Sequence, residues 1–313
     1  MASQVRPFRF GVQANGSMSG RGWTELARRV ESLGYSTLTM PDHFDDQLAP
    51  VPALTAAAAV TETLRIGALV WDNDYKHPLV LAKELATMDV LSNGRVEIGL
   101  GAGWMIADYE QSGIPYDSAK VRIDRFVEGL AVIKGLMGAE PFSFSGEHYS
   151  ISAHNGLPKP VQAPCPPILI GGGGKRVLSI AAREADIVGI NATMAAGVIG
   201  ASVFDTMTAE MVDEKVAIVR NAAGDRWNDI EMNIRAFLVN VTDDARGAAD
   251  GISQMLGVSA EQVEATPFAL VGPPAKLVED LLARRERWGF SYVIVGMNDV
   301  DAFAPVVAAL DGR

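Results

Sequence analysis

The chain has 313 residues, of which 48% are hydrophobic, and a formal net charge of −11. This length and apolar content are sufficient for a large core, and α/β barrels of this size are commonly one domain. The acidic balance argues against nucleic acid and against an anionic membrane as partners.

Cysteine usage and the N-terminus favour a cytoplasmic protein. The single cysteine, Cys165, leaves no disulfide framework within the chain, which suits a reducing compartment. Residues 1–9 lack the apolar core of a signal peptide, and no run of 18 apolar residues is present. We therefore expect a cytoplasmic protein without a membrane span.

Strand-like and helix-like segments alternate along the first hundred residues. The expected order is strand 8–13, helix 23–33, strand 36–40, helix 52–61, strand 64–70, helix 79–91 and strand 95–100. Apolar periodicity defines these segments, and Gly34, Pro78 and Gly94 mark helix boundaries. Such alternation predicts parallel β-α units.

The alternation continues after an excursion at residues 140–162, in which a small hairpin is expected at 142–151. The other expected segments are helix 121–136, strand 167–170, helix 175–184, strand 186–190, loop 191–204, helix 208–222, strand 230–242, helix 243–264, helix 276–288, strand 292–295 and helix 300–310. Eight strands followed by helices predict an α/β fold, a (β/α)8 TIM barrel with insertions, as one domain over residues 1–313. A doubly wound open sheet is the alternative.

A glycine-rich turn follows the fourth expected strand, in the sequence Arg95-Val-Glu-Ile-Gly-Leu-Gly-Ala-Gly-Trp104. Gly99, Gly101 and Gly103 let the backbone approach a ligand, because no Cβ intervenes, and the helical pattern that follows offers free N–H groups. A tight strand-to-helix turn explains the same residues equally well. The spacing is not the G-x-G-x-x-G fingerprint of dinucleotide-binding folds.

In a barrel, ligands bind at the carboxyl ends of the strands. The segments that this rule places on one rim are Asp42-His43, 70–74, 99–104, 171–174, 189–191 and Gly296. The rim is rich in backbone N–H groups and has one Asp-His pair, so we expect a large planar cofactor that brings its own chemistry. A turn or capping role for Asp42 and surface packing for His43 are the alternatives.

The sequence lacks the residues that several other classes of reaction require. The histidines, His43, His77, His148 and His154, form no H-x-H or H-E-x-x-H pair, so no metal site is expected. A G-x-S-x-G elbow is absent, which argues against a serine hydrolase. Lys175 comes closest to a Schiff-base position, but it begins a helix after four glycines, where it is better placed to meet a phosphate.

Six motifs together carry a family resemblance. They are Met40-Pro41-Asp42-His43, Tyr75-Lys76-His77-Pro78, Leu91-Ser-Asn-Gly-Arg95, Gly99-Leu-Gly-Ala-Gly-Trp104, Pro158-Lys-Pro-Val161 and Pro167-Ile-Leu-Ile-Gly-Gly-Gly-Gly174. With them the chain resembles the bacterial luciferase-like monooxygenase superfamily, in its branch that uses the deazaflavin coenzyme F420. The resemblance covers nearly the whole chain. It implies the luciferase-like barrel, coenzyme F420 or alternatively FMN in the barrel mouth, and a homodimer.

The resemblance also implies roles for the matching residues. His43 is the catalytic proton donor or acceptor beside the ring, and Asp42 contacts the cofactor. Leu69 and Val70 are expected to be joined by a non-proline cis peptide that forms a bulge behind the ring. The turn Gly101, Ala102 and Gly103 passes beside the cofactor. The implied phosphate loop is Gly171, Gly172, Gly173 and Gly174.

Lys175 and Arg176 directly follow this loop at a helix start, where we expect them to meet the anionic tail of coenzyme F420. Both can equally be ordinary solvated helix residues. Trp104 stands where the family's sugar-phosphate dehydrogenases carry a catalytic glutamate. This departure favours an apolar substrate pocket, with Trp71 and Trp104 as candidate walls. Pocket lining and core packing explain Trp71, Trp104 and Tyr109 equally well. For His77, before a helix-opening proline, packing or capping is expected.

We therefore expect an F420-dependent oxidoreductase that transfers a hydride between the deazaflavin and a small organic substrate. The alternatives are an FMN-dependent monooxygenase that uses reduced flavin and oxygen, and a non-catalytic flavin-binding protein of the same fold.

Overall fold

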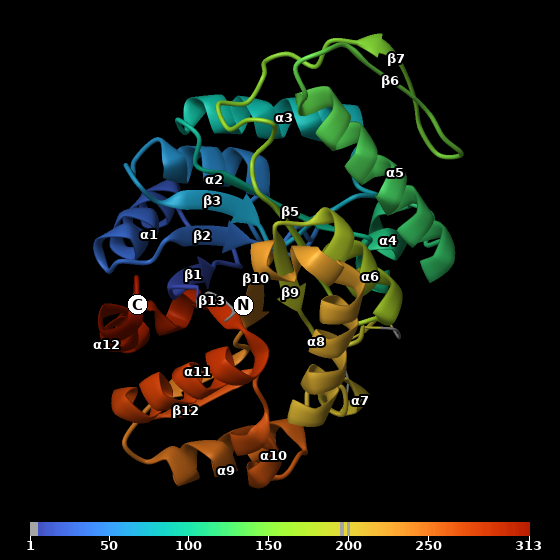
Figure 1. Cartoon of the computed structure of the whole chain (residues 1–313). Coiled ribbons are helices and arrows are strands. Elements are labelled where there is room, and N and C mark those ends of the chain that lie inside the picture. Colours follow the sequence, from blue (N-terminus) through green and yellow to red (C-terminus); the bar gives the residue numbers. More distant parts are fainter. Residues whose placement is uncertain (1–5, 195–196, 199–200) are drawn as a thin grey trace. The chain divides into compact units, whose positions relative to one another are not determined.

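The computed structural model describes residues 6–194, 197–198 and 201–313 (Figure 1). Its strands are Arg9–Gln13 (β1), Thr37–Met40 (β2), Arg65–Ala68 (β3), Trp71–Asp72 (β4), Val96–Gly101 (β5), Phe142–Ser145 (β6), Ser150–His154 (β7), Ile168–Gly172 (β8), Ile187–Ile190 (β9), Glu231–Arg235 (β10), Leu238–Val241 (β11), Ala269–Gly272 (β12) and Phe290–Gly296 (β13).

The α-helices are Gly20–Ser32 (α1), Pro50–Ala58 (α2), Pro78–Leu91 (α3), Ile106–Ser112 (α4), Ala119–Met137 (α5), Lys175–Glu184 (α6), Ala201–Phe204 (α7), Ala209–Ala223 (α8), Ala245–Leu256 (α9), Ala260–Ala265 (α10), Pro274–Trp288 (α11) and Val300–Leu310 (α12). Short 3-10 helices lie at Gly224–Asp229 (η1) and Met297–Asp299 (η2). In the ranges described, no helix has the length and apolarity needed to cross a lipid bilayer.

Strand pairing gives the chain the predicted barrel topology. The main sheet has the order β3-β2-β1-β13-β10-β9-β8-β5-β4, and β3 also pairs with β5, so that eight strands form a closed ring. The pairings of β1 with β13, of β10 with β9 and β13, and of β3 with β5 are parallel. Strands such as β2, β5 and β9 are buried throughout, as expected for parallel strands covered on both faces. The (β/α)8 prediction is confirmed.

The contacts within the chain group it into two compact units. The first unit consists of the described part of residues 1–14 together with 29–37 and 170–313, and the second consists of residues 15–28 and 38–169. The interpretation of residues 1–313 as one domain stays a prediction.

In the first unit, the prediction of one long strand at residues 230–242 is wrong. β10 ends at Arg235, and β11 pairs with β12 in a separate parallel sheet, although β12 was not expected from the sequence. The chain changes sheets where the N–H groups of Phe237 and Leu238 bond to the Phe268 carbonyl. Neither Gly nor Pro marks the change, so the run of strand-forming residues conceals it.

The single helix expected at residues 243–264 is also wrong, because α9 and α10 are separate. Gly257 ends α9 with a φ of 69°, in the left-handed region that favours glycine. Ser259 then caps α10 and forms a capping box with Gln262. Figure 1 shows β12 beside these helices, and together they bury a small hydrophobic cluster of Ala249, Ala260, Val263, Ala269 and Val271.

The loop expected at residues 191–204 contains the short helix α7, and its residues 195–196 and 199–200 lie outside the described residues. The buried Lys215 of α8 joins the two ends of this region. Its ammonium donates to the Asn191 carbonyl at 2.8 Å and to the Thr206 carbonyl at 2.7 Å. The two bonds hold Asn191 and Thr206 close to α8.

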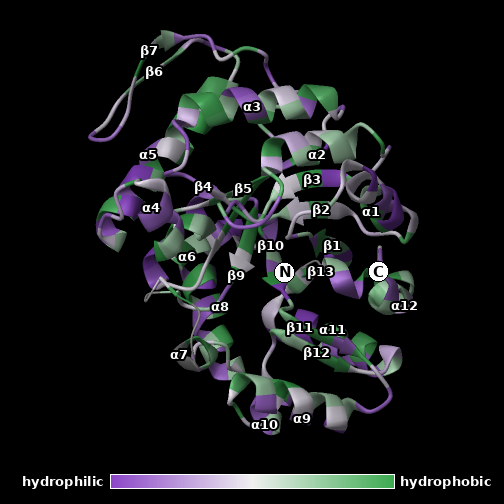
Figure 2. Ribbon diagram, turned by 180° about the vertical axis from the view of Figure 1, so that it is seen from behind, coloured by the Kyte–Doolittle hydropathy of each residue, from purple (hydrophilic) through white to green (hydrophobic). Residues whose placement is uncertain are grey.

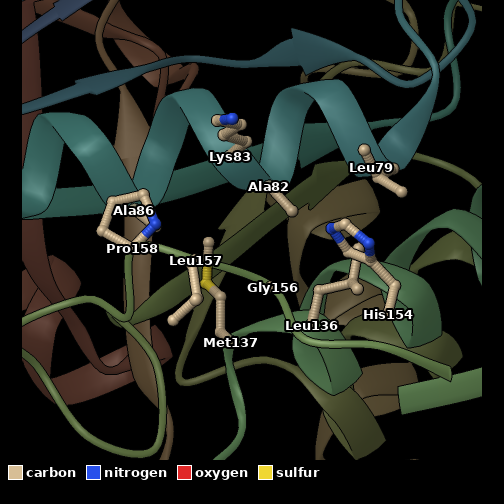
Figure 3. A pocket seen from close by; sticks show the side chains of 10 residues that line it. All are labelled: Leu79, Ala82, Lys83, Ala86, Leu136, Met137, His154, Gly156, Leu157 and Pro158. Atoms are coloured by element: carbon tan, nitrogen blue, oxygen red, sulfur yellow. The ribbon is translucent and has the colours of Figure 1, made fainter. Parts of the chain in front are cut away.

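In the second unit, α3 packs against α5, and β6 and β7 form the antiparallel hairpin expected at residues 142–151 (Figure 1). A small cavity lies between α3 and the segment before β8 (Figure 3). Its lining is Leu79, Ala82, Lys83, Ala86, Leu136, Met137, His154, Gly156, Leu157 and Pro158. None of these residues ends a barrel strand, and most are apolar, so we interpret the cavity as a packing gap.

The end of β3 and the strand β5 approach each other closely. The peptide between Leu69 and Val70 is cis, as the resemblance implies. A Cβ at Gly99 would collide with the carbonyl oxygen of Ala68, and a Cβ at Gly101 would lie 2.5 Å from Val70 Cγ2. The packing of β3 against β5 therefore requires these glycines, whatever ligand binds nearby.

We predict that Gly101→Ala lowers the free energy of unfolding by about 1–3 kcal/mol, because its Cβ has to displace the Val70 side chain. Gly251→Ala in α9 is the control, because a Cβ there meets open space. This control should raise stability by about 0.5–1 kcal/mol, the usual gain in a helix interior. Urea denaturation measures both, and a Gly101→Ala protein as stable as the parent would contradict the packing argument.

Candidate functional site

A polar cluster in the second unit begins just after β2. His43 Nδ1 lies 2.6 Å from Asp108 Oδ2. The His43 side chain is 17% exposed and that of Asp108 is 4% exposed, so the imidazole is at the accessible end of the pair. Because Asp108 engages Nδ1, Nε2 is the ring nitrogen left for proton exchange with a bound molecule.

Asp108 is held in place by two further donors. Its Oδ2 accepts from the Tyr75 hydroxyl at 2.8 Å, and its Oδ1 accepts from the Phe44 N–H at 3.3 Å. Figure 2 shows α4 as largely hydrophilic, yet Asp108, in its first turn, is buried. The positive end of the helix favours a carboxylate at this position. Asp108 is therefore fixed and in turn fixes the orientation of His43.

Aromatic rings surround the pair. The Trp104 ring meets the His43 ring edge-on at 5.8 Å, and Phe44 and Tyr75 lie 4.5 Å apart. Trp71 is buried, and its indole Nε1 has no hydrogen-bond acceptor in the part of the chain that the structure describes. Trp104 thus contacts the candidate catalytic residue, whereas Trp71 lies in the core. Their assignment as pocket walls stays a prediction.

A second group of carboxylates surrounds β4. Asp42 accepts the N–H of Asp72 at 3.3 Å, and Asp72 accepts the N–H of Asp74 at 2.9 Å and the Tyr109 hydroxyl at 3.2 Å. Burial raises the pKa of Asp42 to about 6 and that of Asp72 to about 7, because it disfavours the charged form. Both groups therefore titrate near neutral pH.

Arg125 neutralises the third carboxylate of this group. Its Nε and Nη2 donate to Asp74 at 2.7 and 2.8 Å, and its Nη1 donates to Asp117 at 2.8 Å. The forked pairing suits a carboxylate and is stronger than a single neutral hydrogen bond. Among the described side chains, no cation forms an ion pair with Asp72, which explains why burial dominates its pKa.

The glycines at residues 171–174 belong to the first unit. Gly171 and Gly172 are the last residues of β8, which extends two residues beyond the expected strand, and Gly173 and Gly174 connect it to α6. Gly174 caps α6 without a side-chain hydrogen bond, which leaves first-turn N–H groups for an anion. A Cβ at Gly173 would collide with the Ala192 carbonyl, whereas Gly174 faces open space. Lys175 and Arg176 are exposed in the first turn. The loop has the donors that a phosphate requires, and its role stays a prediction.

Two other sequence expectations can be compared with the structure. His77 Nδ1 accepts from the Leu79 N–H at 3.2 Å and caps α3, which confirms its capping role. Within the described ranges, no three His, Cys, Asp or Glu side chains are arranged to hold a metal ion.

The sequence analysis missed Asp108 and Arg125. It placed Asp72 and Asp74 in the rim segment 70–74 and considered Tyr109 as a pocket wall or core aromatic, but it did not predict the carboxylate group that the three form. Asp108 carried one usable signal, since it is an acidic residue in the first turn of the helix after the glycine-rich turn. Its contact with His43, which is 65 positions away in the chain, carried none. The same holds for Asp74 and Arg125, which are separated by 51 positions.

Comparison with known proteins identifies a family. The family model described as luciferase-like monooxygenase matches residues 5–292. The FMNH2-dependent dimethylsulfone monooxygenase of Pseudomonas putida is 30% identical over 221 residues, which are 69% of this chain and 57% of that protein. The F420-dependent glucose-6-phosphate dehydrogenase of Amycolatopsis mediterranei (strain U-32) is 30% identical over 185 residues, 56% of this chain and 55% of that protein.

The chain thus matches little more than half the length of these two relatives. Among solved structures, the coenzyme F420-dependent tetrahydromethanopterin reductase of Methanopyrus kandleri has a TM-score of 0.78 at 18% identity, covering 96% of this chain and 97% of that one. This likeness supports the fold.

We predict that Asp72→Asn raises the free energy of unfolding at pH 8 by about 1–4 kcal/mol. The pKa of Asp72 is about 7 in the folded state and near 3.8 unfolded, so the folded protein binds more protons between these values. The free energy of unfolding of the parent therefore falls as pH rises through this range. The Asp72→Asn side chain does not ionise, so the variant does not lose this stability.

Chemical denaturation at pH 5 and pH 8 measures the effect, which should shrink at pH 5. Asp45→Asn, at an exposed carboxylate, is the control and should change stability by about 0.5 kcal/mol or less at both values. If the stability difference between Asp72→Asn and the parent were the same at pH 5 and pH 8, the raised pKa of Asp72 would be refuted.

Proposed function

Because the chain belongs to the luciferase-like monooxygenase family, we propose that it is a coenzyme F420-dependent oxidoreductase that transfers a hydride between the deazaflavin and an organic substrate. The observation that carries this proposal is the His43–Asp108 pair after β2. It provides one oriented proton relay, as suits an enzyme whose cofactor brings the chemistry.

The ring of the cofactor would lie beside His43, whose side chain is partly exposed and meets the Trp104 ring edge-on. The Trp71 Nε1 is fully buried, so it offers no donor to a bound ring. When bound, the deazaflavin supplies hydride transfer at its C5.

The chain's own residues would then orient the reactants and move one proton. His43 Nε2 donates or accepts that proton, while the Asp108 carboxylate stabilises the charged imidazole. Tyr75 holds Asp108 by its hydroxyl, so that the imidazole keeps one orientation. The Trp104 ring meets the His43 ring edge-on and lies beside the relay.

The second candidate is an FMN-dependent monooxygenase. The similarity to the FMNH2-dependent dimethylsulfone monooxygenase favours it, because that match covers the larger share of this chain. The two candidates differ in oxygen chemistry, since reduced flavin forms a peroxide adduct and the deazaflavin does not readily react. Cofactor preference therefore separates them.

We predict that His43→Ala leaves cofactor affinity nearly unchanged and lowers turnover by about 10²–10⁴-fold, the usual range for a lost general acid or base. Asp108→Asn should lower turnover by about 10–100-fold, as expected for a residue that orients the catalytic group. It should also change the pH profile of turnover, which a merely structural defect would leave in place. Steady-state kinetics measures both variants, and parent-like turnover of His43→Ala would show that His43 is structural.

We predict that coenzyme F420 binds at least about tenfold more tightly than FMN, a difference of roughly 1.4 kcal/mol. Both ligands have a first phosphate, but F420 adds an anionic tail that a chain of net charge −11 would repel without local cations. Lys175→Ala combined with Arg176→Ala should therefore weaken F420 more than FMN. Fluorescence titration with each ligand measures this, and equal affinities in the parent would favour the monooxygenase.

A further inference from the structure

Arg235 stands where three neighbouring strands of the first unit end. It is the last residue of β10, Gln13 is the last residue of β1, and Gly296 is the last residue of β13. Gln13 is in register with Gly296, and Arg235 is in register with Ile294. The guanidinium therefore lies at the carboxyl ends of parallel strands, where barrel enzymes place binding groups.

The hydrogen bonds of Arg235 leave one end of its guanidinium open. Nε donates to Gln13 Oε1 at 3.1 Å, and Nη1 donates to the carbonyls of Ala236 and Ile294. Nη2 has no partner among the described residues. Unlike the Trp71 nitrogen, Nη2 is not sealed from solvent. Two N–H groups are thus held in a fixed direction for an acceptor from outside.

Arg235 also lacks a counter-charge within contact distance. It forms no ion pair with any described residue, and Asp299, the carboxylate that acts on it electrostatically, accepts the Gly296 N–H at 3.2 Å instead. Burial lowers the pKa of Arg235 to about 10. A desolvated cation of this kind is stabilised by an anion that reaches it.

An apolar surface adjoins the guanidinium. The ring of Phe237 lies 5.4 Å from the Arg235 guanidinium carbon and stacks on Phe268 at 6.0 Å. Phe237 is nevertheless 45% exposed, which is unusual for a ring that continues a buried strand. The combination of an open guanidinium and an exposed ring matches a molecule with an anionic group and an apolar body.

We propose that Arg235 binds the carboxylate of an organic acid substrate through its Nη2, with Phe237 contacting the apolar part of that substrate. The proposal deepens the proposed function, on which it rests for the reaction, and it adds an anionic group to an otherwise apolar substrate. The binding step itself involves only residues of the first unit.

Binding of phenylacetate and of its neutral counterpart phenylacetamide to the full chain tests the proposal, by calorimetry and by the shift in Tm. The parent should bind phenylacetate at least about tenfold more tightly than phenylacetamide, since only the acid pairs with the guanidinium. Arg235→Gln should remove that preference, and Arg235→Lys, which keeps the charge, should retain part of it. Arg183→Gln, at an exposed arginine of α6, is the matched control and should bind like the parent.

Several outcomes would overturn the proposal. Equal binding of acid and amide by the parent, or a preference that survives Arg235→Gln, removes the anion site. A lower Tm of Arg235→Gln with unchanged phenylacetate affinity makes Arg235 a structural residue. If Arg235→Gln loses F420 or FMN in the fluorescence titration, Arg235 belongs to the cofactor site. If the parent binds neither cofactor but keeps an Arg235-dependent preference for the acid, the proposed function fails while the carboxylate site stands.

Discussion

In the second unit, more carboxylates than cationic side chains are buried around His43, and this imbalance constrains the arrangement of the polar groups there. Asp72, Asp74 and Asp108 have almost no exposed surface, and Asp42 is half-buried beside them. Charges that leave water have to find a partner or give up their charge. Arg125 satisfies Asp74, and His43 with Tyr75 satisfies Asp108. Asp42 and Asp72 are left with N–H and hydroxyl donors, and their pKa values rise accordingly.

The position of His43 follows from the same constraint. An imidazole is the one common side chain that can meet a buried carboxylate and still exchange a proton near neutral pH. The first unit has the opposite imbalance at its strand ends, where the cation of Arg235 lies without a carboxylate in contact. The role that we propose for His43 thus depends on its pairing with a buried carboxylate, whereas the role that we propose for Arg235 depends on the lack of such a pairing among the described residues.

The local sequence pattern was sufficient to predict most of the fold. The features that could not be predicted depend on contacts between residues that are distant in the sequence. The alternation of strand and helix identified the barrel, because each segment carries its own periodicity and boundary residues. The break after Arg235 could not be predicted, because the backbone partner at Phe268 that redirects the chain is distant in sequence. This error also concealed a candidate site. Because Arg235 was expected in the middle of a strand, it was not considered as a residue of the rim. His43 was identifiable because its strand was bounded correctly, whereas Asp108 required the placement of α4.

The close approach of β3 and β5 affects how relatives of this chain should be compared. Glycines near the carboxyl end of a barrel strand are readily taken as marks of a shared cofactor. Here the carbonyl of Ala68 and the side chain of Val70 already leave no room for a Cβ at Gly99 and Gly101. A relative can therefore keep both glycines because of this packing alone, whether or not it uses the same cofactor. Evolutionary divergence in cofactor use is better sought at positions that the protein's own packing leaves free, such as Gly174.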